Sequence, residues 1–269
     1  MKNILIPTDF SINAQKAIDY AILLFKKEEC TFHILHAYQM VPSAPGGKLD
    51  SENQLNQIVK KLKVEKENPK HNFKNIMITD TPLSAINVSI KNNDVDYVFM
   101  GTKGAKGLQG IFMGSTTVNV IKNIDTCPIV SVPEKSKYGV PDEIIFTNDF
   151  KNPFKKVEII PLITLAELCK STLTVVYIKI GKELSNEQKS NKKLLANNLK
   201  KVKHQFLEVV MDYSLSSTIH RLEKENKKIG MVAMLKNKHG FFEKLLREPV
   251  IRNVTFTTEV PFLVLPTIE

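Results

Sequence analysis

The chain has 269 residues, 42% of them hydrophobic and 25% charged, and its formal net charge is +10 at pH 7. This composition predicts an ordinary soluble globular protein of one large or two modest domains. It excludes a membrane-spanning protein, since no apolar run approaches the roughly 18 residues needed to cross a bilayer.

The basic charge and the few cysteines indicate the partners and the compartment. Lysines alternate with acids along predicted helices, as in residues 60–67. This pattern is typical of solvated helix faces, so we expect no binding to nucleic acid or to membranes. Cys30, Cys127 and Cys169 are scattered, and no secretory signal precedes Pro7. These features predict a cytoplasmic protein.

Strands and helices alternate along the first half of the chain. Apolar runs such as Ile4–Ile6 and Val98–Met100 are short and uninterrupted, as expected for strands that are buried on both faces. The pattern predicts a five-stranded parallel sheet with helices on both sides. The predicted strands are 2–7, 30–37, 73–78, 95–100 and 128–132, and the predicted helices are 12–26, 51–67, 82–92 and 114–124.

The second half repeats this plan. The run Asn3–Phe10 returns as Glu143–Phe150, and the run Thr126–Pro133 returns as Glu259–Pro266. A duplication of this size, about 130 residues, indicates two domains rather than a solenoid. The strands predicted for the second half are 143–147, 172–178, 205–210, 229–234 and 262–265.

We therefore predict two consecutive α/β domains, residues 1–137 and 138–269, with a boundary in the charged segment 134–141. Each is expected to be an open, Rossmann-like parallel sheet. Right-handed crossovers give the strand order 3-2-1-4-5. Ligands bind beyond the carboxyl ends of such strands where the order reverses, which here is between the first and fourth strands.

The first strand ends at this expected crevice in Pro7, Thr8 and Asp9. Asp9 is a candidate ligand for a ribose, because a carboxylate accepts hydrogen bonds from two neighbouring hydroxyl groups. The alternative is that Asp9 serves as the N-cap of the helix that follows.

A glycine-rich segment follows the fourth strand. Five of the chain's eleven glycines lie between Gly101 and Gly114, and Ser115 and Thr116 then begin a helix. Free N–H groups, the positive end of the helix dipole and hydroxyl donors together predict an anion site. We expect a β-branched residue at Gly114 to block phosphate and to strain the turn. The alternative is a flexible loop before a well-capped helix.

The spacing Gly101-x2-Gly104-x9-Gly114-Ser115 is neither a Walker loop nor a dinucleotide fingerprint. It resembles the ATP-binding signature of the universal stress protein family, and Pro7–Ser11 resembles the start of that family's domain. The resemblance covers nearly the whole chain, more closely in the first half, and the chain looks like a tandem member.

The resemblance implies an ATP-binding regulatory protein, commonly with Mg²⁺ or Mn²⁺ on the phosphates. It implies a role for Asp9 toward the nucleotide, and it implies that backbone groups at Ala37 hold the adenine. It also implies pairing of the two domains as a pseudo-dimer through the fifth strands, Ile129–Val132 and Phe262–Leu265, and it leaves further homodimerisation open. The candidate nucleotide-binding residues are Pro7, Thr8, Asp9, Ala37, Gly101, Gly104, Gly114, Ser115 and Thr116.

The second half departs from the signature where binding would need it intact. Asp149 matches Asp9, but the later positions do not match. Aligned through the flanking strands, they read Met234 or Leu235 for Gly101, Asn237 for Gly104, Arg247 for Gly114, and Glu248 or Pro249 for Ser115. A glutamate at a helix start satisfies the N–H groups internally and repels phosphate. We expect one nucleotide per chain, in the first half.

The same residues bear on several alternative functions. The glycine loop offers no general base, which favours a binding module over a slow ATPase or a nucleotide-dependent phosphotransferase using the same site. A nucleotide-free scaffold would suit the second half alone. A metal shared by Cys30, His33 and His36 is disfavoured, because residues 33 and 36 of a strand point to opposite faces. A phosphorylation pocket of the receiver type is disfavoured as well, because it would need a lysine near the fifth strand and the sequence has none there.

Overall fold

A computed structural model describes residues 1–39, 47–102, 113–135, 139–179, 183–237, 240–247 and 258–267. These residues form two compact units, one up to Glu134 and one from Lys135 onward. No helix in the described ranges is long and apolar enough to span a membrane.

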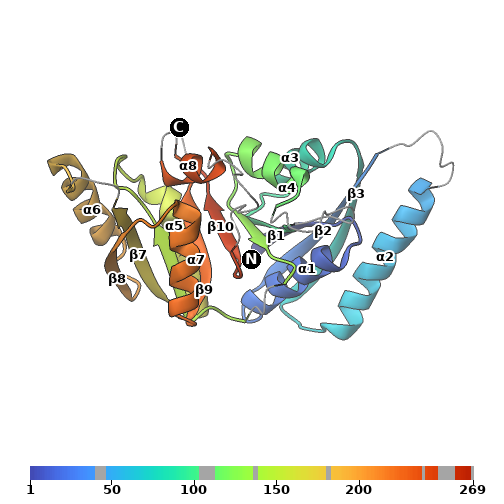
Figure 1. Cartoon of the computed structure of the whole chain (residues 1–269). Coiled ribbons are helices and arrows are strands. Elements are labelled where there is room, and N and C mark those ends of the chain that lie inside the picture. The colour runs from blue at the N-terminus through green and yellow to red at the C-terminus, as the bar shows by residue number, and fades with distance from the viewer. Residues whose placement is uncertain are drawn as a thin grey trace. The chain divides into compact units, whose positions relative to one another are not determined.

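The first unit is a five-stranded parallel sheet in the order β3-β2-β1-β4-β5, as predicted. Helices α1 and α2 lie on one face of the sheet, and α3 and α4 lie on the other (Figure 1). The elements are β1 Lys2–Pro7, α1 Ile12–Leu24, β2 Cys30–Tyr38, α2 Gly47–Glu65, β3 His71–Thr79, α3 Pro82–Asn92, β4 Tyr97–Gly101, α4 Ser115–Asn123 and β5 Ile129–Val132.

The core of the first unit explains its apolar strands. Ile4, Leu5 and Ile6 in β1 have no exposed surface, as expected for a central strand that is covered by helices on both faces. Beside β1, the ring of Phe25 packs 5.6 Å from Tyr97 and 6.1 Å from Phe99, measured between ring centroids. This packing holds the carboxyl end of α1 against the strand β4.

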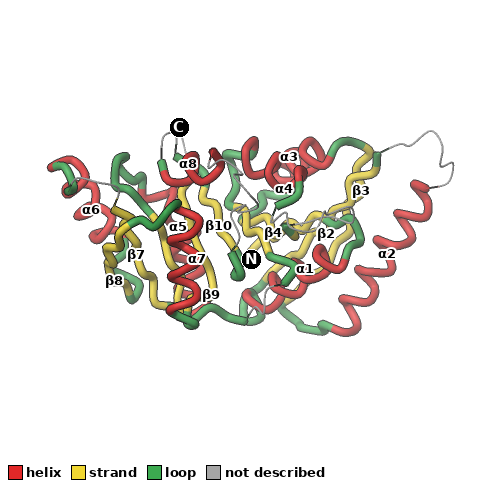
Figure 2. The backbone as a smooth tube through the Cα atoms, in the orientation of Figure 1, coloured by secondary structure: helices red, strands yellow, loops and turns green. Residues whose placement is uncertain are grey.

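The second unit has the same topology, in the order β8-β7-β6-β9-β10. Its strands again pair in parallel, and Figure 2 shows them alternating with helices along the chain. The elements are β6 Glu143–Thr147, α5 Lys156–Cys169, β7 Thr172–Lys179, α6 Asn186–Asn198, β8 His204–Val210, α7 Leu215–Glu225, β9 Ile229–Leu235, α8 Phe241–Arg247 and β10 Phe262–Leu265.

Most element boundaries lie within about two residues of the predicted ones, and two helices differ more. Helix α2 begins at Gly47, whereas the sequence predicted a helix that begins at residue 51. Helix α8, Phe241–Arg247, occupies part of the degenerate second loop, where no helix was expected. Phe241 and Phe242 are both buried, so tertiary packing of two aromatic side chains supports a helix too short to be stable alone.

A buried carboxylate ties the segment before β10 to helix α7. Glu223 is 6% exposed, and it accepts hydrogen bonds from the Thr258 hydroxyl and, at 3.0 Å, from the Glu259 N–H. Desolvation by burial raises the pKa of Glu223 from 4.5 to about 7, although these two hydrogen bonds act in the opposite direction. The protonated form is therefore favoured by folding.

The raised pKa of Glu223 predicts a pH-dependent stability. An acid whose pKa is higher in the folded state contributes stability below its unfolded pKa, and that contribution is lost as the pH rises through about 7. We expect Glu223→Gln to unfold with a larger free energy than the wild type at pH 8, by about 2–3 kcal/mol. The difference should vanish toward pH 4.5. Urea unfolding at several pH values measures it.

Glu225→Gln is the matched control, because Glu225 lies in the same helix but is exposed and pairs with Arg221 at 3.2 Å. A surface pair of this kind contributes little, so this variant should follow the wild-type pH profile. Equal profiles for Glu223→Gln and the wild type would show that Glu223 is not protonated in the folded state at neutral pH.

Candidate functional site

The turn after β1 is shaped by its own side chains. Phe10 has a φ of 65°, in the left-handed region that non-glycine residues rarely adopt. The Phe10 N–H donates to the Thr8 hydroxyl at 3.0 Å, and the Ser11 N–H donates to Asp9 Oδ1 at 3.2 Å. The Ser11 side chain accepts from the Ala14 N–H and is the N-cap of α1. Asp9 is therefore not the cap, and its exposed carboxylate lies on the rim of the turn.

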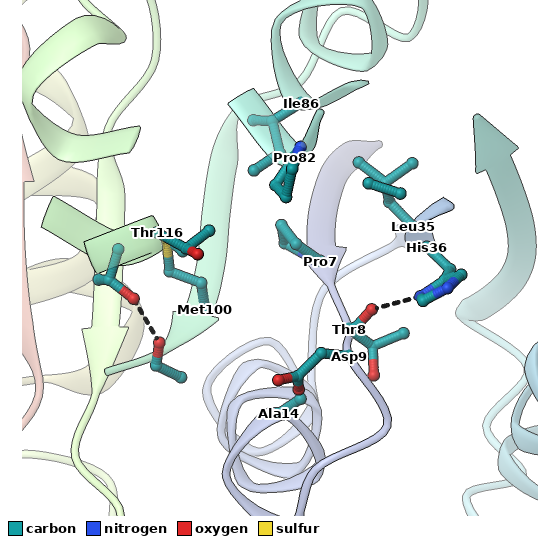
Figure 3. Close-up of a pocket in the computed structure, with 13 residues that line it drawn as sticks. Pro7, Thr8, Asp9, Ala14, Leu35, His36, Pro82, Ile86, Met100 and Thr116 are labelled. Carbon is teal, nitrogen blue, oxygen red and sulfur yellow. Dashed lines mark hydrogen bonds between the residues drawn. The ribbon is translucent and has the colours of Figure 1, made fainter. Parts of the chain in front are cut away.

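His36 holds this turn from the neighbouring strand. Its Nδ1 lies 2.9 Å from the carbonyl oxygen of Thr8, which can only accept, so Nδ1 carries the proton (Figure 3). The His36 ring also packs on Phe10, with centroids 4.3 Å apart. The sequence pattern indicated His36 only as a disfavoured metal ligand. The feature of the sequence that could have indicated its role in holding the turn is the position of His36 near the carboxyl end of the second strand.

Gly101 ends β4 against the first turn of α1. A Cβ atom at Gly101 would lie 2.7 Å from Nδ2 and 2.9 Å from Cγ of Asn13. The glycine is thus required by helix packing, in addition to the ligand approach for which the sequence suggested it. The pairing of β1 with β4 and this close contact bring the start of α1 to the end of β4.

This contact predicts that Gly101→Ala destabilises the protein by about 1–3 kcal/mol, because an overpacked site forces Asn13 to move. Urea unfolding measures the loss. Gly139→Ala is the control, since no atom of the described residues lies within 4 Å of a Cβ at that position. The loss should shrink in an Asn13→Ala background, and an undiminished loss there would show that the Asn13 side chain is not the cause.

Helix α4 begins at the same edge of the sheet. Gly114 is its N-cap without a side-chain cap, and Ser115 and Thr116 in the first turn are exposed. The Thr117 hydroxyl donates to the Gly101 carbonyl oxygen at 3.0 Å, so this hydroxyl anchors the helix to β4. Gly114 has φ −65° and ψ 159°, which any residue can adopt. The expected strain for a β-branched residue at Gly114 is therefore wrong, and only the phosphate argument stands.

These segments enclose one pocket of about 140 Å³ within the first unit (Figure 3). Six of the predicted residues line it: Pro7, Thr8, Asp9, Ala37, Gly101 and Thr116. Gly114 and Ser115 do not line it but immediately precede Thr116, and Gly104 lies outside the described residues. The sequence did not indicate the other lining residues, which are Ala14, Leu35, His36, Pro82, Ile86, Met100 and Thr117.

The second unit repeats the turn but buries it. Phe150 has a φ of 54°, and its N–H donates to Asn148 Oδ1 at 2.6 Å, as Phe10 donates to Thr8. Helix α6 then covers the turn, since Gln188 Nε2 donates to the Asp149 carbonyl oxygen at 2.7 Å and Asn191 Nδ2 to the Phe150 carbonyl oxygen at 2.9 Å. The turn after β6 is therefore covered by α6, whereas the turn after β1 lines an open pocket.

The two equivalent aspartates therefore differ. Asp9 is exposed, whereas Asp149 is 5% exposed and its Oδ2 has no hydrogen-bond partner among the described residues. Desolvation raises the pKa of Asp149, opposed by the hydrogen bond from the Lys151 N–H and by the charges of Lys151 and Lys244. A carboxylate buried in this way is inaccessible to the hydroxyl groups of a ribose.

Strand pairing also settles one alignment in the second unit. Gly101 pairs with Val132, and Leu235 pairs with Leu265 at the same place in the second sheet. The counterpart of Gly101 is therefore Leu235 and not Met234, and its side chain is buried. Arg247 is the last residue of α8, and Glu248 and Pro249 lie outside the described residues. The expectation for those three positions stays a prediction.

Comparison with known proteins agrees with the fold. The chain is 28% identical over 144 residues to universal stress protein MJ0531 of Methanocaldococcus jannaschii, covering 51% of this chain and 84% of the relative. It is also 28% identical over 157 residues to universal stress protein MJ0577 of the same organism, covering 50% of this chain and 96% of the relative. Each relative thus matches one half of the chain.

Some solved structures match both halves of the chain. The crystal structure of a universal stress protein from Archaeoglobus fulgidus has a TM-score of 0.71 and 16% identity, and the match covers 98% of each chain. At this identity the likeness concerns the fold alone. The sequence model of the universal stress protein family matches residues 1–133. Through this first half, the chain belongs to the universal stress protein family.

Proposed function

We propose that the first unit binds one adenine nucleotide, ATP or a relative, as a regulatory ligand that is held and not turned over. The observation that carries the proposal is the pocket at the carboxyl ends of β1, β2 and β4. Asp9, Ala37, Gly101 and Thr116 come from four separate segments, and all four line it. The pocket lies at the reversal of strand order, where open parallel sheets bind ligands.

The lining suits the parts of a nucleotide. Leu35, Ala37, Pro82, Ile86 and Met100 supply apolar surface for a flat base, and backbone groups at Ala37 can select it. The exposed carboxylate of Asp9 is placed to accept hydrogen bonds from ribose hydroxyl groups.

The phosphate end of the ligand is assigned to the start of α4. Figure 3 shows Thr116 and His36 on opposite sides of the pocket, with Asp9 between them. The uncapped first turn of α4 supplies N–H groups and the positive end of the helix dipole. We therefore place the base toward β2 and α3, the ribose at Asp9, and the phosphates at Ser115 and Thr116.

Few side chains of the described residues are available to bind a divalent ion at this site. No group of three His, Cys, Asp or Glu side chains that could hold a metal occurs in the described parts of the chain. The exposed Ser115 hydroxyl is an oxygen donor at the proposed phosphate end. An Mg²⁺ or Mn²⁺ ion would therefore be bound mainly through phosphate oxygens, which is how Mg²⁺ usually binds with nucleotides.

Mass spectrometry of the denatured, freshly purified protein tests the ligand directly. We expect an adenine nucleotide in the wild type and little of it in Asp9→Asn, a variant that keeps an oxygen for the Ser11 N–H. Retention of a guanine or flavin nucleotide in its place would contradict the assignment of the base.

The absence of a general base from the glycine loop predicts slow turnover. We expect phosphate release from ATP well below about 1 per second, the lower end of usual enzyme rates. A coupled phosphate assay measures it. Sustained release at or above that rate, lost in Ser115→Ala, would support the ATPase alternative.

Two further expectations remain part of this proposal. We propose a cytoplasmic location, which fractionation of cells that express the tagged chain tests. We also propose that the two domains pair with each other through their fifth strands. Whether two chains further form a homodimer is a separate question, which sedimentation of the whole chain tests.

A further inference from the structure

A second groove lies in the first unit, away from the nucleotide pocket, between helix α2 and the edge strand β3. It has a volume of about 510 Å³. Its helical side is one face of α2, with residues spaced i, i+3, i+4 and i+7, and α2 lies alongside β3 in Figure 1. The lining residues are Asn56, Val59, Lys60, Lys63, Asn72, Phe73, Lys74 and Asn75.

The charged side chains that line this groove are all positive. Lys60, Lys63 and Lys74 are exposed, no acidic residue lines the groove, and no ion pair joins any of the three lysines to another described residue. By contrast, Lys61 and Lys66, also near the end of α2, pair with Glu65 at 3.9 Å and with Asp19 at 3.4 Å. The groove therefore presents unneutralised positive charge.

The strand beside the lysines has an open edge. Among the described strands, β3 pairs only with β2. The Cys30 N–H donates to the Lys70 carbonyl oxygen, whereas the His71 N–H donates to Asn68 and not to β2. Because alternate residues of a parallel strand face opposite neighbours, Phe73 and Asn75 turn their N–H and C=O groups away from β2 and toward the groove.

The lysines lie on both sides of this edge. Phe73 is buried and Asn75 donates to Asn56 of α2, so the odd-numbered side chains face the helix. Lys74 points to the opposite face, where its charge lowers the pKa of His33 after the larger effect of desolvation. An extended segment added along β3 would thus meet Lys60 and Lys63 on one face and Lys74 on the other.

We infer that this groove binds an extended, acidic peptide segment of a partner protein by adding it as a strand to the edge of β3. The open backbone groups supply main-chain hydrogen bonds, and the three lysines select carboxylates. A single-stranded nucleic acid fits less well, because base stacking needs an exposed aromatic face and Phe73 is only 3% exposed. The proposal is independent of nucleotide binding.

Fluorescence anisotropy with a dye-labelled octaglutamate peptide and the full chain tests the proposal. We expect Lys60→Glu/Lys63→Glu to raise the dissociation constant at least tenfold, because like charges then face the peptide. Lys26→Glu/Lys27→Glu changes the net charge equally on exposed lysines, and we expect a change of less than about threefold, since neither of these lysines lines the groove. Equal losses in the two variants would overturn the site.

Two further probes separate strand addition from other modes. An octaglutamate methylated on every second backbone nitrogen keeps its charge but loses the hydrogen bonds along one edge, and we expect it to bind at least tenfold more weakly. Unchanged affinity would overturn strand addition. Tighter binding of an octathymidylate that Lys60→Glu/Lys63→Glu abolishes would overturn the acidic peptide in favour of nucleic acid.

Discussion

Replacing Gly114 by aspartate is expected to weaken ATP binding at least tenfold. Gly114 is the N-cap of α4, and no side chain caps the first turn. An aspartate there accepts hydrogen bonds from the N–H groups that we assign to phosphate, and its negative charge repels the ligand. The backbone conformation at Gly114 suits any residue, so the protein should fold normally and α4 should gain a few tenths of a kcal/mol. Calorimetric titration measures the affinity.

Adenosine and Gly114→Asn serve as controls for this experiment. Adenosine has no phosphate, so its affinity should be the same in the wild type and in Gly114→Asp. Gly114→Asn caps the helix without the charge, and its loss of ATP affinity should be smaller than that of the aspartate. If Gly114→Asp bound ATP as tightly as the wild type, the start of α4 would not be the phosphate site.

Titration of the whole chain with ATP should show one site per chain. Asp9 is exposed at the pocket rim, whereas its counterpart Asp149 is covered by α6, and Leu235 occupies the place of Gly101. We therefore expect Asp9→Asn to lose at least tenfold in affinity, in line with the roughly 1.5–3 kcal/mol of a hydrogen bond to a charged group. Asp149→Asn should leave both affinity and stoichiometry unchanged.

Thermal unfolding gives an independent measure of the same prediction. Saturating ATP should raise the melting temperature of the wild type and of Asp149→Asn equally, because a ligand stabilises only the state that binds it. Two equivalent sites per chain, or a loss of affinity in Asp149→Asn equal to that in Asp9→Asn, would show that the second unit binds nucleotide.

Much of the candidate site could be predicted from local sequence. The apolar runs, the repeated start of each half and right-handed crossovers led to the observed strand order in both units. That order places the ends of β1 and β4 at one edge of the sheet, and Asp9 and Gly101 indeed line one pocket. The prediction worked because strand burial and crossover handedness depend on short segments and general stereochemistry.

The sequence by itself thus determined the two α/β units, the strand order and the residues at the end of β1. Only the tertiary structure decided that Ser11 rather than Asp9 caps α1, that Gly101 makes room for Asn13, and that Asp149 is buried. These outcomes depend on which side chains from distant segments meet, such as Gln188 over the Asp149 carbonyl group. Contacts of that kind have no periodic signal along the chain, because they depend on the packing of whole helices against the sheet.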